Sequence, residues 1–230
     1  MKLWGVGLGP GDPELVSFMA VRIVKEADVV FVPLSGKDRE SVAGHILESH
    51  VSRETVPFVF PMIRDEEERD GFIAAKLDEL RPCWEGCENM ALPVIGDSAL
   101  YATVAYFYDA LKKLCPSAEL ELVPGISAHS LASCRAGEFM ALGRERFSVV
   151  PGTASVDDIM SILASSDSAV IYKPSALGSG LASVVDMTGP WKTVTRIDRA
   201  GLDDERILRG RKALEPVGEY LSVVELLRWR

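Results

Sequence analysis

The sequence has no long apolar run, few basic residues and few cysteines. No stretch approaches the length that a membrane-spanning helix needs, so we expect no membrane partner. Lys and Arg number 25 against 34 Asp and Glu, which gives a formal net charge of −9. This charge argues against a general nucleic-acid binder, because such proteins need a basic face for phosphates. It leaves room for a local basic cleft that binds a small anionic ligand.

Cysteine is scarce, and its spacing is uninformative. The chain has four cysteines: Cys83, Cys87, Cys115 and Cys134. Their spacing fits no zinc or redox motif, and the interval between the first two is one residue too wide for CxxC. The three histidines, His45, His50 and His129, show no metal-ligand spacing either. We therefore expect no metal site. The first apolar run follows Met1-Lys2 directly, without a signal-peptide pattern, which predicts free thiols in a reducing cytoplasm.

A glycine-rich stretch at residues 3–15 organises the chain. It begins as an apolar run typical of a buried strand and then breaks at glycine and proline. Asp12 suits a helix N-cap, and Pro13 suits the first helical position, where its missing N–H costs nothing. The stretch therefore predicts a strand, a turn and a helix, with backbone N–H groups and a positive helix end at the turn. By itself, the turn is equally consistent with a connection that binds nothing.

The glycine spacing excludes two familiar phosphate-binding loops. A GxGxxG fingerprint that starts at Gly5 needs glycine where Pro10 stands. One that starts at Gly7 needs glycine where Asp12 stands, and that carboxylate would repel a pyrophosphate. A Walker loop fails as well, because no Gly-Lys-Ser/Thr follows.

Strand and helix patterns alternate through the first half of the chain. Strands are expected in the opening run and at residues 28–33, 55–60, 90–95 and 119–123. Helices are expected at residues 12–27, 42–49 and 66–80, after Ser98, and from an N-cap at Ser127 to about Ala136. Pro57 places the third strand at an edge, since proline cannot donate to a ladder. The alternation predicts a parallel, doubly wound sheet with helices on both faces.

Turn residues follow each expected strand, at residues 9–13, 33–41, 61–65, 96–98 and 124–127. Ligands of open α/β sheets bind at the carboxyl ends of the strands, so these loops favour a binding crevice over a bare scaffold.

The pattern changes beyond about residue 144. Strands are expected at residues 147–150, 169–172, 193–197 and 220–224, helices at 157–164 and 181–185, and a flexible loop at 175–180. We therefore expect two α/β domains, residues 1–135 with the parallel sheet and residues 136–230 with a mixed sheet. A site in the cleft between them is the natural location for a small-molecule ligand.

Four blocks, in order, resemble the tetrapyrrole methylases, the S-adenosylmethionine-dependent enzymes of corrin and sirohaem synthesis. They are the opening loop Gly5–Pro13, Gly96-Asp97 with Leu100-Tyr101, Val123–Ser127, and Ala200-Gly201 within Arg199–Glu205. Each block is weak alone, but the ordered set spans nearly the whole chain. Within the family, Gly9–Leu15, Phe60–Asp65 and Tyr172-Lys173 are most similar to the branch that methylates precorrin-2 or its cobalt form at C20 in cobalamin biosynthesis.

The resemblance implies a class III methyltransferase fold with S-adenosylmethionine held between two α/β domains, a tetrapyrrole substrate and a homodimer. The implied cofactor contacts are Pro10, Gly96, Asp97, Leu100, Ser127, Ala128, Tyr172, Lys173 and Ala200. The substrate carries eight carboxylates, and the candidate cations for them are Arg39, Arg64 and Lys173. For the homodimer, the sequence adds only that Tyr106, Phe107 and Tyr108, on one helix, cannot all face one core.

The methylated carbon must lose a proton, and Asp12 and Asp97 lie on loops suited to a base. Each aspartate also has a simpler structural role, Asp12 as an N-cap and Asp97 as a brace of its loop. Ser98 departs from the family, which has proline there, and we expect its side chain to cap the next helix. The segment Arg81–Glu88, with Pro82 inside it, is shorter than the corresponding family helix.

Other interpretations stay open. A second methylase interpretation changes the ring position to C11 or C17, although Phe60–Asp65 argues against it. A diphthine-synthase-like enzyme would use the same fold on a protein side chain. A non-catalytic, nucleotide-binding regulatory module is the alternative outside enzymes.

Overall fold

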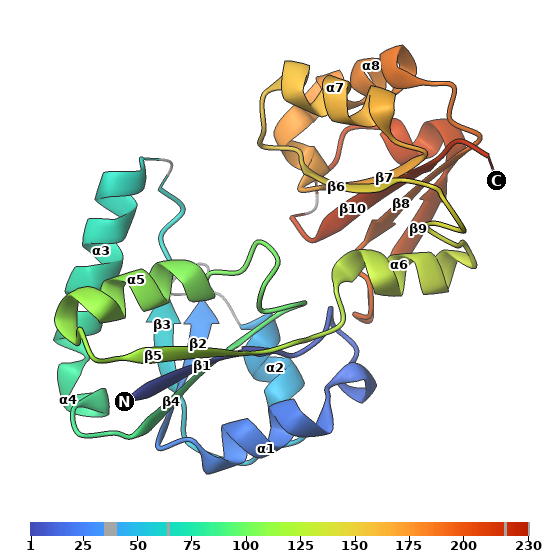
Figure 1. The fold of residues 1–230 in the computed structure, drawn as a ribbon. Helices are drawn as coiled ribbons and strands as arrows, with labels where there is room; N and C mark the ends of the chain where they lie inside the picture. Colours follow the sequence, from blue (N-terminus) through green and yellow to red (C-terminus); the bar gives the residue numbers. More distant parts are fainter. Residues whose placement is uncertain (35–40, 64, 219, 230) are drawn as a thin grey trace. The chain divides into compact units, whose positions relative to one another are not determined.

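The computed structural model describes residues 1–34, 41–63, 65–218 and 220–229 (Figure 1). The chain divides into two compact units, Met1–Ser127 (unit 1) and Ala128–Arg230 (unit 2). The helix α6 (Ala128–Ala136) falls in unit 2, whereas the sequence places the domain boundary after it, near residue 135. The structure divides before α6 because this helix packs on the sheet of unit 2.

Unit 1 is built on a five-stranded sheet of order β3-β2-β4-β1-β5, in which every neighbouring pair is parallel. The strands are β1 (Lys2–Gly7), β2 (Val29–Leu34), β3 (Val56–Val59), β4 (Asn89–Val94) and β5 (Glu119–Val123). The predicted parallel sheet is thus confirmed. The strand with Pro57 lies at its edge, as the missing N–H of proline requires.

Helices cover both faces of this sheet, as Figure 1 shows. They are α1 (Phe18–Glu26), α2 (Val42–Glu48), α3 (Glu66–Glu79), the single turn α4 (Arg81–Trp84) and α5 (Val104–Leu114). One core joins α1 and α2 to the sheet through side chains such as Ile23 and Ile46. The other core joins α3 and α5 to the opposite face, where the rings of Phe58 and Phe107 lie 5.0 Å apart. Burial of two apolar layers makes the sheet doubly wound.

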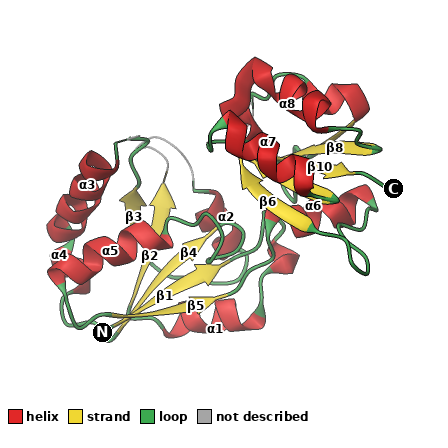
Figure 2. Ribbon diagram, turned by 45° about the horizontal axis from the view of Figure 1, so that its top comes forward, coloured by secondary structure: helices red, strands yellow, loops and turns green. Residues whose placement is uncertain are grey.

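Unit 2 has a mixed sheet of order β6-β7-β10-β8-β9. Its strands are β6 (Phe147–Pro151), β7 (Ser168–Tyr172), β8 (Thr193–Asp198), β9 (Arg206–Arg209) and β10 (Ser222–Leu227). β6 is parallel to β7, and the other pairs are antiparallel. Helices α7 (Val156–Ser165) and α8 (Leu181–Thr188) cover one face, and α6 covers the other (Figures 1 and 2).

Local structure differs from the sequence prediction in several places. The helix expected at residues 12–27 is two elements, the 3₁₀ helix η1 (Pro13–Leu15) and α1, because Ser17 accepts a bond from the N–H of Ala20 and starts a helix of its own. The loop expected to be flexible at residues 175–180 lies in a 3₁₀ segment, η2 (Pro174–Gly180). The prediction also missed β9 and the 3₁₀ helix η3 (Gly210–Leu214).

Three glycines let the loops after β1, β4 and β5 touch. A Cβ at Gly125 would lie 2.3 Å from the carbonyl oxygen of Gly96 and 2.8 Å from the carbonyl carbon of Gly7. A Cβ at Gly7 would in turn lie 2.5 Å from the nitrogen of Gly125. Real Cβ atoms do not approach backbone so closely, so any side chain at Gly7 or at Gly125 would force the loops apart.

We predict that Gly125→Ala lowers the free energy of unfolding of unit 1 by about 1–3 kcal/mol, the usual cost of overpacking. Gly71→Ala is the matched control. Gly71 is exposed in α3 and an added Cβ there meets no atom within 4 Å. The free energy of unfolding of this control should rise by about 0.5–1 kcal/mol, since alanine is a better helix former than glycine. Chemical denaturation measures both, and equal effects of the two variants would contradict the close contact.

Candidate functional site

The loops that follow β1 and β4 are bonded to each other at the carboxyl edge of the unit 1 sheet. The N–H of Gly9 donates to the carbonyl of Gly96 at 3.2 Å, and the N–H of Gly96 donates back to Gly9 at 2.7 Å. Because parallel strands end at one edge, the opening loop and the Gly96-Asp97 loop meet there. The structure thus brings two predicted blocks together.

Asp97 links this pair of loops to the loop after β5. One carboxylate oxygen accepts from the N–H of Ala99 at 2.7 Å, and the other accepts from the N–H of Gly125 at 3.2 Å. Charged acceptors make stronger bonds than neutral ones. Both oxygens of Asp97 therefore hold backbone in place.

Ser98 does not cap the next helix, contrary to the sequence prediction. It is buried, and its hydroxyl donates to the carbonyl of Val123 at 2.8 Å. The helix α5 begins five residues beyond the predicted start, after Thr103, which makes no side-chain cap bond. The hydroxyl binds the last residue of the edge strand β5, which lies on the other side of β1 from β4. Proline at this position would lack that donor.

Backbone conformation is unusual in the same block. Gly96 has φ +77°, and a Cβ there would meet no atom within 4 Å, so its main chain faces open space. Tyr101 also has a positive φ, 51°, and burial raises the pKa of its phenol. Leu100 is half-buried, and its N–H bonds to the carbonyl of Asp97 at 3.4 Å. The open space beside Gly96 gives a ligand access to backbone groups.

The opening loop is buried at Pro10, and Asp12 follows it at the start of η1. The carboxylate of Asp12 accepts from the N–H of Glu14 at 3.0 Å, which is the predicted N-cap bond. A ring nitrogen of His50, beyond α2, lies 2.8 Å from the carbonyl oxygen of Pro13. The contact between His50 and Pro13 therefore holds the loop that carries Asp12 in place.

In unit 2, the start of α6 is tied to the end of β7. The N–H of His129 donates to the phenol oxygen of Tyr172 at 3.3 Å, and Nδ1 of its ring lies 2.8 Å from the same oxygen. Both side chains are half-buried. These bonds place Ala128, the first residue of α6, near Tyr172. Ser127 immediately precedes α6 and ends unit 1.

Two other predicted contacts of unit 2 follow strand ends. Lys173, after β7, has the left-handed φ of 52°, and Arg199, after β8, has φ 55°. Ala200, the residue after Arg199, is buried. Arg199 itself donates a hydrogen bond to Asp204, which lowers the pKa of that carboxyl. β10 separates β7 from β8, so Ala200 sits two strands away from Lys173.

The predicted substrate cations Arg39 and Arg64 lie outside the described residues. Sequence reasoning also missed the cross-loop bond of Ser98 and the positive φ of Tyr101. The bond of Ser98 has no local signal, because its acceptor, the carbonyl of Val123, lies in a distant part of the sequence.

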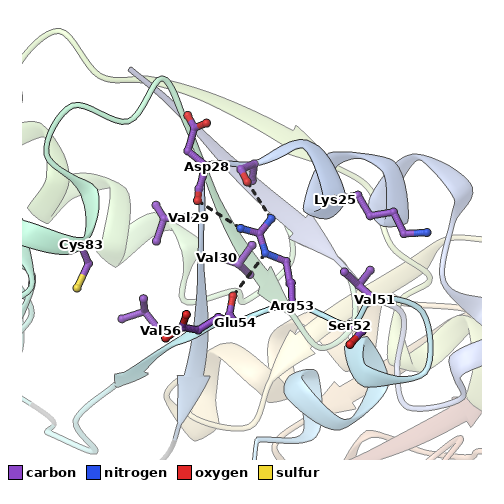
Figure 3. Close-up of a pocket in the computed structure, with 11 residues that line it drawn as sticks. Lys25, Asp28, Val29, Val30, Val51, Ser52, Arg53, Glu54, Val56 and Cys83 are labelled. Atoms are coloured by element: carbon purple, nitrogen blue, oxygen red, sulfur yellow. Dashed lines mark hydrogen bonds between the residues drawn. The ribbon is translucent and has the colours of Figure 1, made fainter.

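A cavity of about 520 Å³ lies at the opposite, amino edge of the unit 1 sheet (Figure 3). Arg53 dominates it and donates to the carbonyls of Val24 at 2.7 Å, Ala27 at 2.8 Å and Asp28 at 3.3 Å. The guanidinium thus satisfies carbonyls at the carboxyl end of α1, where a cation is favourable. Its Nε–H donates to the carbonyl of Glu54 at 3.4 Å, so four of its five N–H groups bind backbone carbonyls and this cavity has the chemistry of a helix end.

Among the residues that the structure describes, no three His, Cys, Asp or Glu side chains are grouped to hold a metal ion. All four cysteines are free thiols. Over the described part of the chain, no helix has the length and apolar character to cross a membrane.

The chain is similar to several known proteins over most of its length. A probable cobalt-precorrin-2 C(20)-methyltransferase of Methanocaldococcus jannaschii is 28% identical over 241 residues, covering 100% of this chain and 97% of that protein. A cobalt-precorrin-2 C(20)-methyltransferase of Salmonella typhimurium is 25% identical over 210 residues, covering 90% of this chain and 87% of that protein. The uroporphyrin-III C-methyltransferase of Thermus thermophilus, solved with S-adenosyl homocysteine, shares the fold with a TM-score of 0.69 at 18% identity, covering 99% of this chain and 92% of that one.

The family profile of the tetrapyrrole (corrin/porphyrin) methylases matches residues 2–214, which include every block on the loops described above. The chain therefore belongs to the tetrapyrrole methylases.

Proposed function

We propose that this chain transfers a methyl group from S-adenosylmethionine to C20 of precorrin-2 or cobalt-precorrin-2 in cobalamin biosynthesis. The observation that carries the proposal is the meeting of three family blocks at one sheet edge, through Gly9, Gly96 and Gly125. Relatives that match nearly the whole chain bear the names of C20-methyltransferases, which favours this ring position.

Backbone groups suit the proposed cofactor. The open space beside Gly96 lets a ligand reach main-chain N–H and C=O groups, which can bind the polar edges of methionine and adenine. The proposed contacts in unit 1 are Pro10, Gly96, Asp97, Leu100 and Ser127, and those in unit 2 are Ala128, Tyr172, Lys173 and Ala200. When bound, S-adenosylmethionine supplies an electrophilic methyl group to a nucleophilic ring carbon.

Positioning is the main task of the protein in this chemistry. Holding two reactants in the right orientation lowers the activation barrier by roughly 7–11 kcal/mol, because their translational and rotational freedom has already been lost on binding. In the proposal, Asp97 holds the cofactor loops by its two backbone bonds, and Asp12 caps η1. Neither aspartate is then the proton acceptor. Lys173 is the described cation that we assign to the substrate carboxylates, and we assign Arg39 and Arg64 to the same role from the sequence.

We further propose that the protein works in the cytoplasm as a homodimer. The free thiols are consistent with a reducing compartment. The family resemblance supports the dimer. Of the three adjacent aromatics on α5, Phe107 is buried, Tyr108 bonds to the carbonyl of Ala118, and Tyr106 is 39% exposed beneath the guanidinium of Arg69.

Methyl transfer can be assayed anaerobically on precorrin-2 and on cobalt-precorrin-2 in parallel, with NMR locating the new methyl group. We predict methylation at C20 of at least one of them. Methylation at C11 or C17 would keep the family and correct the position. Cofactor binding without turnover on any tetrapyrrole would support the regulatory module instead.

Two amide variants separate bracing from proton transfer. We predict that Asp97→Asn raises the KM for S-adenosylmethionine about tenfold, because one backbone N–H loses its acceptor at a cost of about 1–3 kcal/mol. Its kcat should stay within a few fold of the wild-type value. Asp12→Asn should change neither constant, since asparagine caps a helix as well as aspartate.

The exposed Asp109→Asn serves as the control for loss of one carboxylate. A fall in kcat of about 100–10,000-fold in either variant, with KM unchanged, would identify that aspartate as the base and refute its bracing role.

Light scattering tests the dimer. The chain has a mass of 25.0 kDa, so a homodimer should give twice that value at micromolar concentration. A mass of one chain under these conditions would contradict it.

A further inference from the structure

A row of polar side chains crosses the face of the unit 2 sheet that α6 covers. Glu225 on β10 is paired with Thr195 on β8, and Thr195 is paired with Arg209 on β9. Glu225 is 3% exposed and Thr195 is fully buried. Buried polar groups of this kind must find partners, so the contacts with α6 decide whether the row is stable.

Helix α6 binds this row at two points. The hydroxyl of Ser133 donates to a carboxyl oxygen of Glu225 at 2.9 Å. At the end of the helix, Arg209 donates to the carbonyl of Ala136 at 2.8 Å. The N–H of Glu138 bonds back to the carbonyl of Ser133 at 2.9 Å, so the chain turns sharply after the helix.

That turn brings a second carboxyl group under α6. One oxygen of Glu138 accepts from Thr195 at 2.9 Å and from Arg209 at 2.6 Å. Its other oxygen is buried and has no hydrogen-bond partner among the described residues. The side chain of Glu138 is only 12% exposed.

The charges beneath α6 do not balance when both carboxyl groups are ionised. Glu225 faces Ser133 from α6, Glu138 from the following turn, Thr195 from β8 and the apolar Val170 from β7. Arg209 is the one cation bonded to the pair among the described residues, and it serves Glu138. Two buried carboxylates with one guanidinium leave an uncompensated negative charge, which is costly.

We propose that Glu138 and Glu225 form a proton-dependent latch, in which a proton on Glu225 holds α6 on the sheet and its loss to solvent accompanies release of the helix. Burial, together with the charge of Glu138, raises the pKa of Glu225 to about 7, which agrees with a retained proton. The start of α6 carries Ala128 and the His129–Tyr172 contact, so the latch positions the proposed cofactor segment. This last step rests on the proposed function.

The direction of the pH effect follows from the two pKa values. Glu225 titrates at about 7 when α6 is docked and near its ordinary value of 4.5 when α6 is released. Docking is therefore strongest below the lower value and weakens as the pH rises towards the higher one. Above the higher pKa, Glu225 has lost its proton whether α6 is docked or released, and the docking equilibrium no longer changes with pH.

Hydrogen exchange of the α6 amides in the full chain tests the latch without any ligand. After correction for intrinsic exchange, we expect the opening constant of α6 to rise about 40-fold between pH 5 and pH 7. Glu225→Gln should abolish this rise, because glutamine has no proton to lose. Glu215→Gln, which removes an exposed carboxylate from the same unit, should keep it.

Equal pH dependence of the wild type and Glu225→Gln would overturn the latch. Glu138→Gln is a second variant, useful if Glu225→Gln fails to fold. It removes the repelling charge, so the rise should become smaller, and an unchanged rise would also overturn the latch.

S-adenosyl homocysteine is the probe for the link to the cofactor. Its binding should slow exchange at the first turn of α6. Binding that leaves α6 exchange unchanged would overturn the link. Failure to bind at any pH from 5 to 8, while the exchange result holds, would refute the proposed cofactor and leave the latch itself supported.

Discussion

The organisation of unit 1 depends on the contact of three loop backbones, at Gly7, Gly96 and Gly125, because a Cβ at Gly7 or at Gly125 would overlap the backbone of the neighbouring loops. Hydrogen bonds then follow from that contact. The carboxylate of Asp97 reaches the N–H of Gly125, and the hydroxyl of Ser98 reaches the carbonyl of Val123. These groups come from the ends of β4 and β5, the two strands that flank β1 in the parallel sheet, so the sheet itself supplies the alignment and the loops need little stiffness of their own.

Much of this fold is visible in the sequence because its signals are local. Buried strands read as continuous apolar runs, Pro57 marks an edge, and the family blocks stand in order. The bond of Ser98 is not visible, since its acceptor lies 25 residues away and is brought close only by the sheet. The strand Arg206–Arg209 escaped prediction because it is an edge strand with little buried apolar surface. The split of the first helix was missed because Asp12 and Ser17 are both good caps.

The two units are stabilised differently at their sheets. Unit 1 is covered by apolar side chains on both faces. In unit 2, the strand β8 carries polar groups on both faces. Arg196 pairs with Asp198 at 3.1 Å and donates to the carbonyl of Glu215 at 2.7 Å on one side, while Thr195 joins the latch on the other. Polar networks of this kind are costly when broken, so they fix the covering segments in one arrangement.

The position of β10 has a consequence for synthesis on the ribosome. It follows the other four strands of unit 2 in sequence, yet it pairs with β7 on one side and β8 on the other. Until Ser222–Leu227 has left the exit tunnel, the sheet of unit 2 is two separate halves with unpaired inner edges. Unit 1 has by then emerged in full and can close its own sheet. A nascent chain at this stage thus has a complete unit 1 and an incomplete unit 2. The unpaired strand edges of unit 2 are the surface that a chaperone would contact.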